Sequence, residues 1–189
     1  MTALPPERPE PARGGPALRA AHVLDAIVGH ACRFVVLATG TTLLVLLTSN
    51  VVARYVLAGG GFEWAQELPE RMFPWFIMAG VALAVQKGGH MAVETLLPRL
   101  DRMGVKTVLL LGHAIVIASY VVLCAEAIGV ADIVSIETSP VLGMPSSTSY
   151  YALALGCVAV ILATLAIALR VGVLGPEAMP APAPEEIGV

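Results

Sequence analysis

The feature that most constrains this chain is a set of four long, uninterrupted apolar segments. They cover residues 34–53, 72–85, 107–125 and 150–169. Three of them have 19 or 20 residues without a charged side chain, and the second has 14. A helix needs about 20 residues to cross a hydrocarbon core roughly 30 Å thick. The second segment reaches that length only if its helix begins near Glu63, so the pattern predicts four spans.

The segments are continuously apolar and do not alternate, which favours helices over the strands of a membrane barrel. Hydrophobic residues make up 57% of the chain and charged residues 13%, whereas soluble domains have roughly 45–50% and about 25%. A net charge of −3 does not provide the basic face that nucleic acid requires. We therefore expect an all-α membrane protein with four transmembrane helices, at about residues 32–56, 63–86, 105–130 and 149–171.

Two Pro-rich stretches flank these segments. Residues 1–16 and 174–189 could bury no core, so we expect disordered tails there and a membrane domain over residues 17–173. Residues 17–31 mix apolar side chains with Arg19, His22 and Asp25. This composition fits either an interfacial helix or an extended start to the first span.

Lys and Arg are distributed unequally between the two sides of this topology. Only Arg54 and Arg71 fall in or beside the loop after the first span. The other nine of the eleven fall on the side of both termini: Arg8, Arg13, Arg19, Arg33, Lys87, Arg99, Arg102, Lys106 and Arg170. The positive-inside rule then predicts that the N-terminus and the C-terminus are both cytoplasmic.

The second span carries a stripe of side chains at helical spacings of three and four. The stripe consists of Trp64, Glu67, Arg71, Trp75 and Met78. It fits an interfacial collar, because acids suit a helix N-terminus and Trp suits the headgroup level. It equally fits a recognition surface for another membrane subunit. Pro69 and Pro74 are expected to kink this helix or to place its true start nearer Pro69.

Two further positions near the outer helix ends carry polar groups. Arg54, four residues after Asn50, can extend to the headgroups or pair with an acid as the chain turns into the second span. The candidate acids are Glu63, Glu67 and Glu70. Glu126 follows the uncharged run 107–125 and is either an exposed interfacial acid or a proton relay.

Other chemistry finds little support in the sequence. His113 has no second ligand near it, and the three cysteines lie far apart, so we expect no metal and no cofactor. Phosphate-binding loops, HExxH and nucleophilic triads are absent from the sequence, so we do not expect an enzyme. In the fourth segment, the pairs Ala152/Gly156 and Ala159/Ala163 have the spacing that allows close helix packing.

Four short motifs occur in order along the chain. The first is N-V-V-A-R-Y, which runs from Asn50 through Arg54 to Tyr55, and the second is W-A-Q-E-L, which contains Trp64 and Glu67 and is followed by Arg71 and Trp75. The third is a Gly/Ala pattern from Gly80 to Gly88 and His90. The fourth is S-P at Ser139 and Pro140, followed by Pro145 and Tyr150. Together they resemble the small, DctQ-like membrane subunit of tripartite ATP-independent periplasmic (TRAP) transporters. Departures from the family pattern include Gln66 and Glu94, and Arg71 falls one position later than the usual Arg.

The resemblance implies a scaffold subunit in the bacterial cytoplasmic (inner) membrane. Its partners would be a large multispanning permease and a periplasmic solute-binding protein, in a sodium-driven symporter for organic acids such as C4-dicarboxylates. The motif residues would be structural or would contact partners. A self-sufficient homo-oligomeric transporter or channel that uses Glu126 stays open as an alternative, and a haem-binding electron carrier as a third class.

Overall fold

The structure is a computed structural model that describes residues 15–56, 61–88 and 101–176. Within these ranges the chain forms four long helices: α1 (Pro16–Val56), α2 (Trp64–Gln86), α3 (Arg102–Ile133) and α4 (Ser147–Leu174). A short 3-10 turn, η4 (Val134–Ile136), follows α3. Each of the four long helices is long and apolar enough to cross a membrane. The predicted all-α, four-helix membrane fold is therefore confirmed.

Helix α1 begins at Pro16, well before the start near residue 32 that hydropathy suggested. Proline suits the first position of a helix, because its φ is already helical and its missing N–H would have no partner there. The added turns bury Leu18, Ala21 and Val28 along one face. Residues 17–31 are thus a continuous extension of the first helix, the second of the two alternatives left open.

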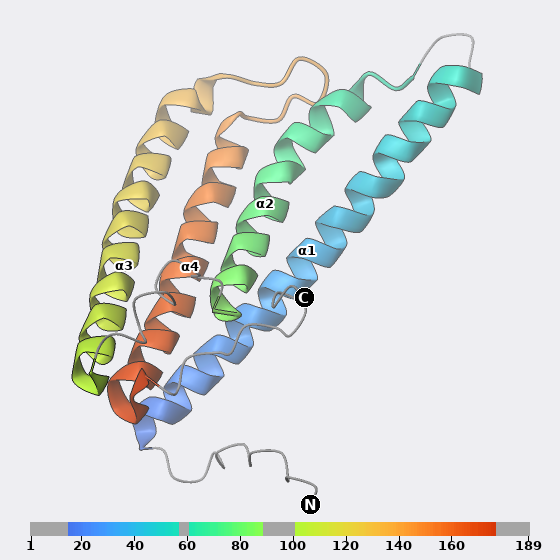
Figure 1. The fold of residues 1–189 in the computed structure, drawn as a ribbon. Coiled ribbons are helices and arrows are strands. Elements are labelled where there is room, and N and C mark those ends of the chain that lie inside the picture. The colour runs from blue at the N-terminus through green and yellow to red at the C-terminus, as the bar shows by residue number, and fades with distance from the viewer. Residues whose placement is uncertain (1–14, 57–60, 89–100, 177–189) are drawn as a thin grey trace, which may run out of the picture.

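The helices have two distinct ends (Figure 1). We call the end where α1 and α3 finish and α2 and α4 begin the loop end. The other, where α1 begins and α4 finishes, we call the terminal end. The expected tails fall mostly on residues 1–14 and 177–189, which lie outside the described residues, as does His90.

Helix α4 is the centre of the packing. It contacts α1, α2 and α3, while α3 packs chiefly against α4 (Figure 1). Small side chains allow this: a Cβ added at Gly156 would overlap the Cβ of Met78 on α2. Ala152, Gly156 and Ala163 are buried, as the small-residue spacing suggested. Helices α1 and α3 remain largely exposed along their length.

Helix α2 runs unbroken through both of its prolines, from Trp64 to Gln86. Pro69 lies at the sixth position, so it removes the hydrogen bond that a residue there would donate to the Ala65 carbonyl. Two glycines on α1 let α2 approach closely. A Cβ at Gly29 would lie 2.9 Å from Gln86 Oε1, and one at Gly40 would lie 2.9 Å from Phe76 Cε2.

Candidate functional site

At the loop end, the Glu67 carboxylate holds the connection between α3 and α4. Glu67 lies in the first turn of α2. Its oxygens accept hydrogen bonds from the Ser139 hydroxyl, from Val141 N at 3.2 Å and from Leu142 N at 3.0 Å. An ionised carboxylate only accepts, which matches three donors converging from one loop. We call this contact the loop clamp.

The clamped loop has a compact internal structure. Thr138 and Pro145 form an antiparallel bridge, and Ser139 N donates to Met144 O at 2.9 Å. Gly143 closes the turn with φ +63°, a conformation that glycine adopts without steric cost. Pro140 has no N–H of its own, so the amides that reach Glu67 come from the two residues after it. The predicted motif residues Pro140 and Pro145 are therefore both parts of the clamped loop.

Arg71, one turn further along α2, contacts the same connection. Its Nη2 donates to Ser146 Oγ at 3.2 Å, just before α4 begins. Further along the stripe, Met78 is buried against Gly156 of α4. Glu67, Arg71 and Met78 of the stripe thus face this chain's own loop and α4. At its start, Trp64 stacks on Phe62 with ring centroids 5.6 Å apart.

Asn50 fastens the turn from α1 into α2. Its Oδ1 accepts a hydrogen bond from Phe62 N at 2.8 Å. A Cβ at Gly61 would collide with the same Oδ1 and lie 3.3 Å from the Asn50 carbonyl oxygen, so the contact requires glycine there. The first motif residue therefore has a local structural role.

Beside this turn is an open pocket of about 360 Å³, which we call the α1–α2 groove. Its lining residues are Leu47, Asn50, Val51, Arg54, Ala65, Gln66 and Pro69. Arg54 is exposed, and no ion pair joins it to Glu63, Glu67 or Glu70 in the part of the chain that the structure describes. Tyr55 beside it is also exposed.

The remaining motif positions lie elsewhere. Gly88 closes α2 at the terminal end with φ +77°, and its N–H donates to Val85 O at 3.0 Å. Trp75 is half-buried in the middle of α2. The structure therefore gathers Glu67, Arg71, Pro140 and Pro145 at one place, while Gly88 lies at the opposite end of the molecule.

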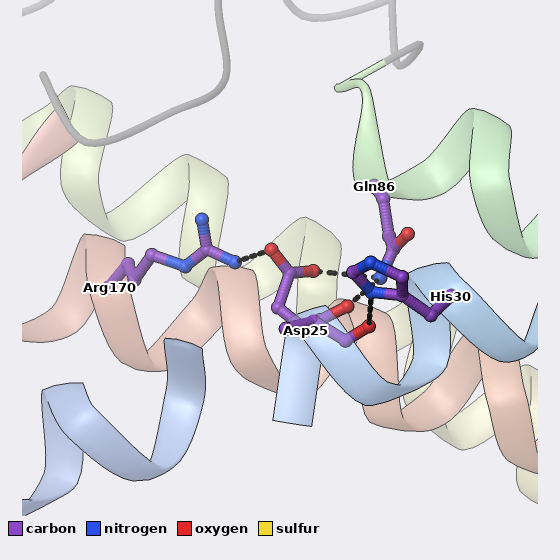
Figure 2. A network of polar contacts seen from close by, with 5 residues as sticks. Asp25, His30, Gln86 and Arg170 are labelled. Atoms are coloured by element: carbon purple, nitrogen blue, oxygen red, sulfur yellow. Dashed lines mark hydrogen bonds and ion pairs between the residues drawn. The ribbon is translucent and has the colours of Figure 1, made fainter. Parts of the chain in front are cut away.

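A second polar cluster, at the terminal end, was not predicted from the sequence (Figure 2). Asp25 on α1 forms an ion pair with Arg170 on α4, and these side chains are 26% and 15% exposed. Gln86, the last residue of α2, donates from Nε2 to the Asp25 carbonyl at 2.8 Å and to its Oδ1 at 2.9 Å. Asp25 thereby joins three helices.

Sequence signals for this cluster were weak. Asp25 is an acid on an otherwise apolar helical face, which hints at a partner. Its partners, however, lie 61 and 145 positions away: Gln86 ends α2, and Arg170 lies just before the last turn of α4. Nearby, His30 Nδ1 lies 2.7 Å from the Ala26 carbonyl of its own helix (Figure 2).

The other candidate chemical groups are dispersed. Glu126 is exposed on α3, and His113 is buried with Nδ1 2.6 Å from the Leu109 carbonyl. Across residues 15–56, 61–88 and 101–176, no group of three His, Cys, Asp or Glu side chains could hold a metal ion. The two clusters hold helices and loops together, and neither converges on an open reaction site.

Comparison with known proteins gives two matches. The family model described as "Tripartite ATP-independent periplasmic transporters, DctQ component" matches residues 43–172, which include every motif position above. The chain is also 49% identical over 150 residues to the uncharacterized protein y4mM of Sinorhizobium fredii (strain NBRC 101917 / NGR234). That match covers 79% of this chain and 28% of the relative, so the chain spans well under a third of the relative's length.

Proposed function

Because this chain belongs to the DctQ family of tripartite ATP-independent periplasmic transporters, we propose that it is the scaffold subunit of a sodium-driven importer for organic acids. It pairs with a large multispanning permease, and a periplasmic solute-binding protein delivers the substrate. The large subunit carries the substrate and sodium sites. This chain holds that subunit in the bilayer.

The α1–α2 groove is the observation that most supports a partner. Its lining places the polar side chains of Asn50, Arg54 and Gln66 beside apolar ones. Polar groups near the hydrocarbon are costly unless protein or headgroups satisfy them. A partner helix that brings a carboxylate to Arg54 would satisfy this surface.

The small number of buried polar side chains in the described part of the chain supports a scaffold function more than a carrier function. Among the described residues, only His113, Ser139, Ser147 and Thr164 are buried polar or charged side chains. Ser139 and Ser147 belong to the loop end, and Thr164 Oγ1 donates to its own helix at Val160 O, 2.8 Å away. An ion-coupled path would require several polar groups in sequence across the bilayer.

We place both termini in the cytoplasm and the loop end in the periplasm. The described cations at the terminal end are Arg19, Arg33, Lys87, Arg102, Lys106 and Arg170, against Arg54 and Arg71 at the loop end. This distribution follows the positive-inside rule for a protein of the bacterial inner membrane.

Co-purification tests the proposed pairing. A tagged chain expressed with its large permease should retain that permease through detergent extraction. Arg54→Gln should reduce retention by about tenfold, since a buried charge partner would be lost. Arg33→Gln, an exposed Arg on the same helix, is the control and should have no effect. Failure of the unaltered chain to retain the permease would contradict the pairing. Equal retention by Arg54→Gln and Arg33→Gln would exclude the α1–α2 groove as the surface that contacts the permease.

A further inference from the structure

At the terminal end, the first turn of α3 and the last turn of α4 enclose a second pocket, of about 340 Å³. We call it the α3–α4 pocket. Its lining residues are Asp101, Arg102, Met103, Lys106, Val173, Leu174, Gly175 and Pro176. We propose that this pocket binds the headgroup of an anionic phospholipid, with the phosphate between Arg102 and Lys106.

Two cations form the polar side of the pocket. Arg102 is the first residue of α3 and Lys106 follows one turn later, so their side chains lie on the same face. Lys106 Nζ donates to the Gly172 carbonyl at 2.7 Å, which fixes the ammonium beside the end of α4. An ammonium has three donors, and a phosphate oxygen can use those that remain.

Gly175 shapes the wall opposite these cations. Its φ of +97° ends α4, and its N–H donates to Val171 O at 3.0 Å. A Cβ at this position would lie 3.5 Å from Arg102 Nη2, so the guanidinium reaches up to the end of α4. Arg102 therefore lies at the junction of the two helices.

Electrostatics favour an anion at this place. The first turn of α3 contains no acid. The positive end of the α3 dipole and the negative end of the α4 dipole both lie at this pocket, so Arg102 and Lys106 supply its positive charge. Asp101 also lines the pocket. Among the described lining residues, two cations and one carboxylate sum to a net charge of +1, which a phosphodiester of charge −1 would neutralise.

Apolar side chains beside the cations point to a lipid and away from a soluble phosphate. Met103, Val173 and Leu174 line the same pocket and are 73%, 58% and 49% exposed. Lys106 directly precedes the uncharged run 107–125, so the pocket lies where headgroups meet the hydrocarbon. A phospholipid supplies phosphate for the cations and acyl chain for this apolar rim.

Lipid binding to the purified full chain tests the proposal. After delipidation in a mild detergent, phosphatidylglycerol, phosphatidylcholine or inorganic phosphate is added, and binding is followed by native mass spectrometry and by thermal unfolding. Phosphatidylglycerol should bind and raise the unfolding temperature, whereas the other two should not. A cation near a lipid surface contributes about 1 kcal/mol. Arg102→Gln with Lys106→Gln should therefore weaken binding by about fivefold per cation, roughly 25-fold in all.

Lys87→Gln is the matched control, because Lys87 is an exposed cation at the same end outside the pocket. Val173→Glu provides a second route that keeps Arg102, Lys106 and the hydrogen bond from Lys106 to Gly172. The added carboxylate on the exposed rim should weaken phosphatidylglycerol binding, and Val173→Gln should weaken it less. The proposal is overturned if the double variant binds phosphatidylglycerol as tightly as Lys87→Gln does. Equal binding of phosphatidylcholine, or stabilisation by inorganic phosphate alone, would also overturn it.

Discussion

The carboxylate of Glu67 accepts a hydrogen bond from the Ser139 hydroxyl, although 72 residues separate them in the chain. This contact ties the start of α2 to the connection between α3 and α4. Arg71 repeats the link one turn later through Ser146. Two charged side chains at the start of α2 therefore hold the connection between α3 and α4 at the loop end.

Glu67→Gln should lower the free energy of unfolding of the chain and loosen the loop between α3 and α4. The amide presents one acceptor oxygen instead of two and turns an N–H₂ donor towards other donors, so loop amides lose their partner. Unfolding in detergent and the rate of proteolysis within residues 137–146 measure the effect. Glu70→Gln, an exposed acid on the same helix, is the control. If both variants unfold and are cleaved alike, the loop clamp does not stabilise the fold.

Gly156→Ala should destabilise the packing of α2 on α4 by about 1–3 kcal/mol. The new methyl group would overlap the Cβ of Met78, and two packed helices must separate to admit it. Gly172→Ala on the same helix has nothing within 4 Å of its new Cβ and should be neutral or slightly stabilising. Thermal unfolding of the two variants compares them directly. Equal stability of both would show that α4 is not in close contact with α2 at this position.

The Asp25–Arg170 ion pair should appear as an energetic coupling. Asp25→Asn and Arg170→Gln each leave one partly buried partner, so the double variant should lose less stability than the sum of the two single variants. A coupling of about 0.5–3 kcal/mol is expected for contacting residues. The same cycle with Arg33→Gln in place of Arg170→Gln should be additive, because Arg33 is exposed on α1 two turns away. Additive behaviour of the first cycle would mean that the ion pair contributes nothing.

Asn50→Ala and Gly61→Ala should have similar effects, each of about 0.5–1.5 kcal/mol, because each breaks the hydrogen bond from Phe62 N to Asn50 Oδ1. Combining them should cost little more than either one alone. The free energy of unfolding of the three variants measures this. A fully additive result would show that the two residues act separately.

Hydropathy predicted the four helices because their burial in lipid depends on the composition of each segment alone. It left open whether residues 17–31 extend the first helix, because Arg19, His22 and Asp25 lower the hydropathy of a segment that still buries Leu18 and Ala21. The small-residue pattern around Gly156 predicted close packing, but it could not identify Met78 as the neighbour.

In the candidate site, too, the sequence predicted which residues matter but not which residues they contact. Motif spacing singled out Asn50, Glu67, Arg71, Pro140 and Pro145, and the last four meet in one cluster. Spacing did not reveal that Glu67 and Arg71 contact this chain's own loop, because the loop is 70 residues further along. Asp25, Gln86 and Arg170 were missed because their contact depends on how three helices pack, which no local pattern encodes.

Uptake in proteoliposomes tests the central claim most directly. The chain alone, and the chain with its large permease and binding protein, are reconstituted, and accumulation of a labelled organic acid is followed with and without a sodium gradient. We expect sodium-dependent uptake only when all three proteins are present, and Glu126→Gln should leave it unchanged, since Glu126 is exposed on α3. Sodium-driven uptake by the chain alone, abolished by Glu126→Gln, would contradict the scaffold function and establish a self-sufficient transporter.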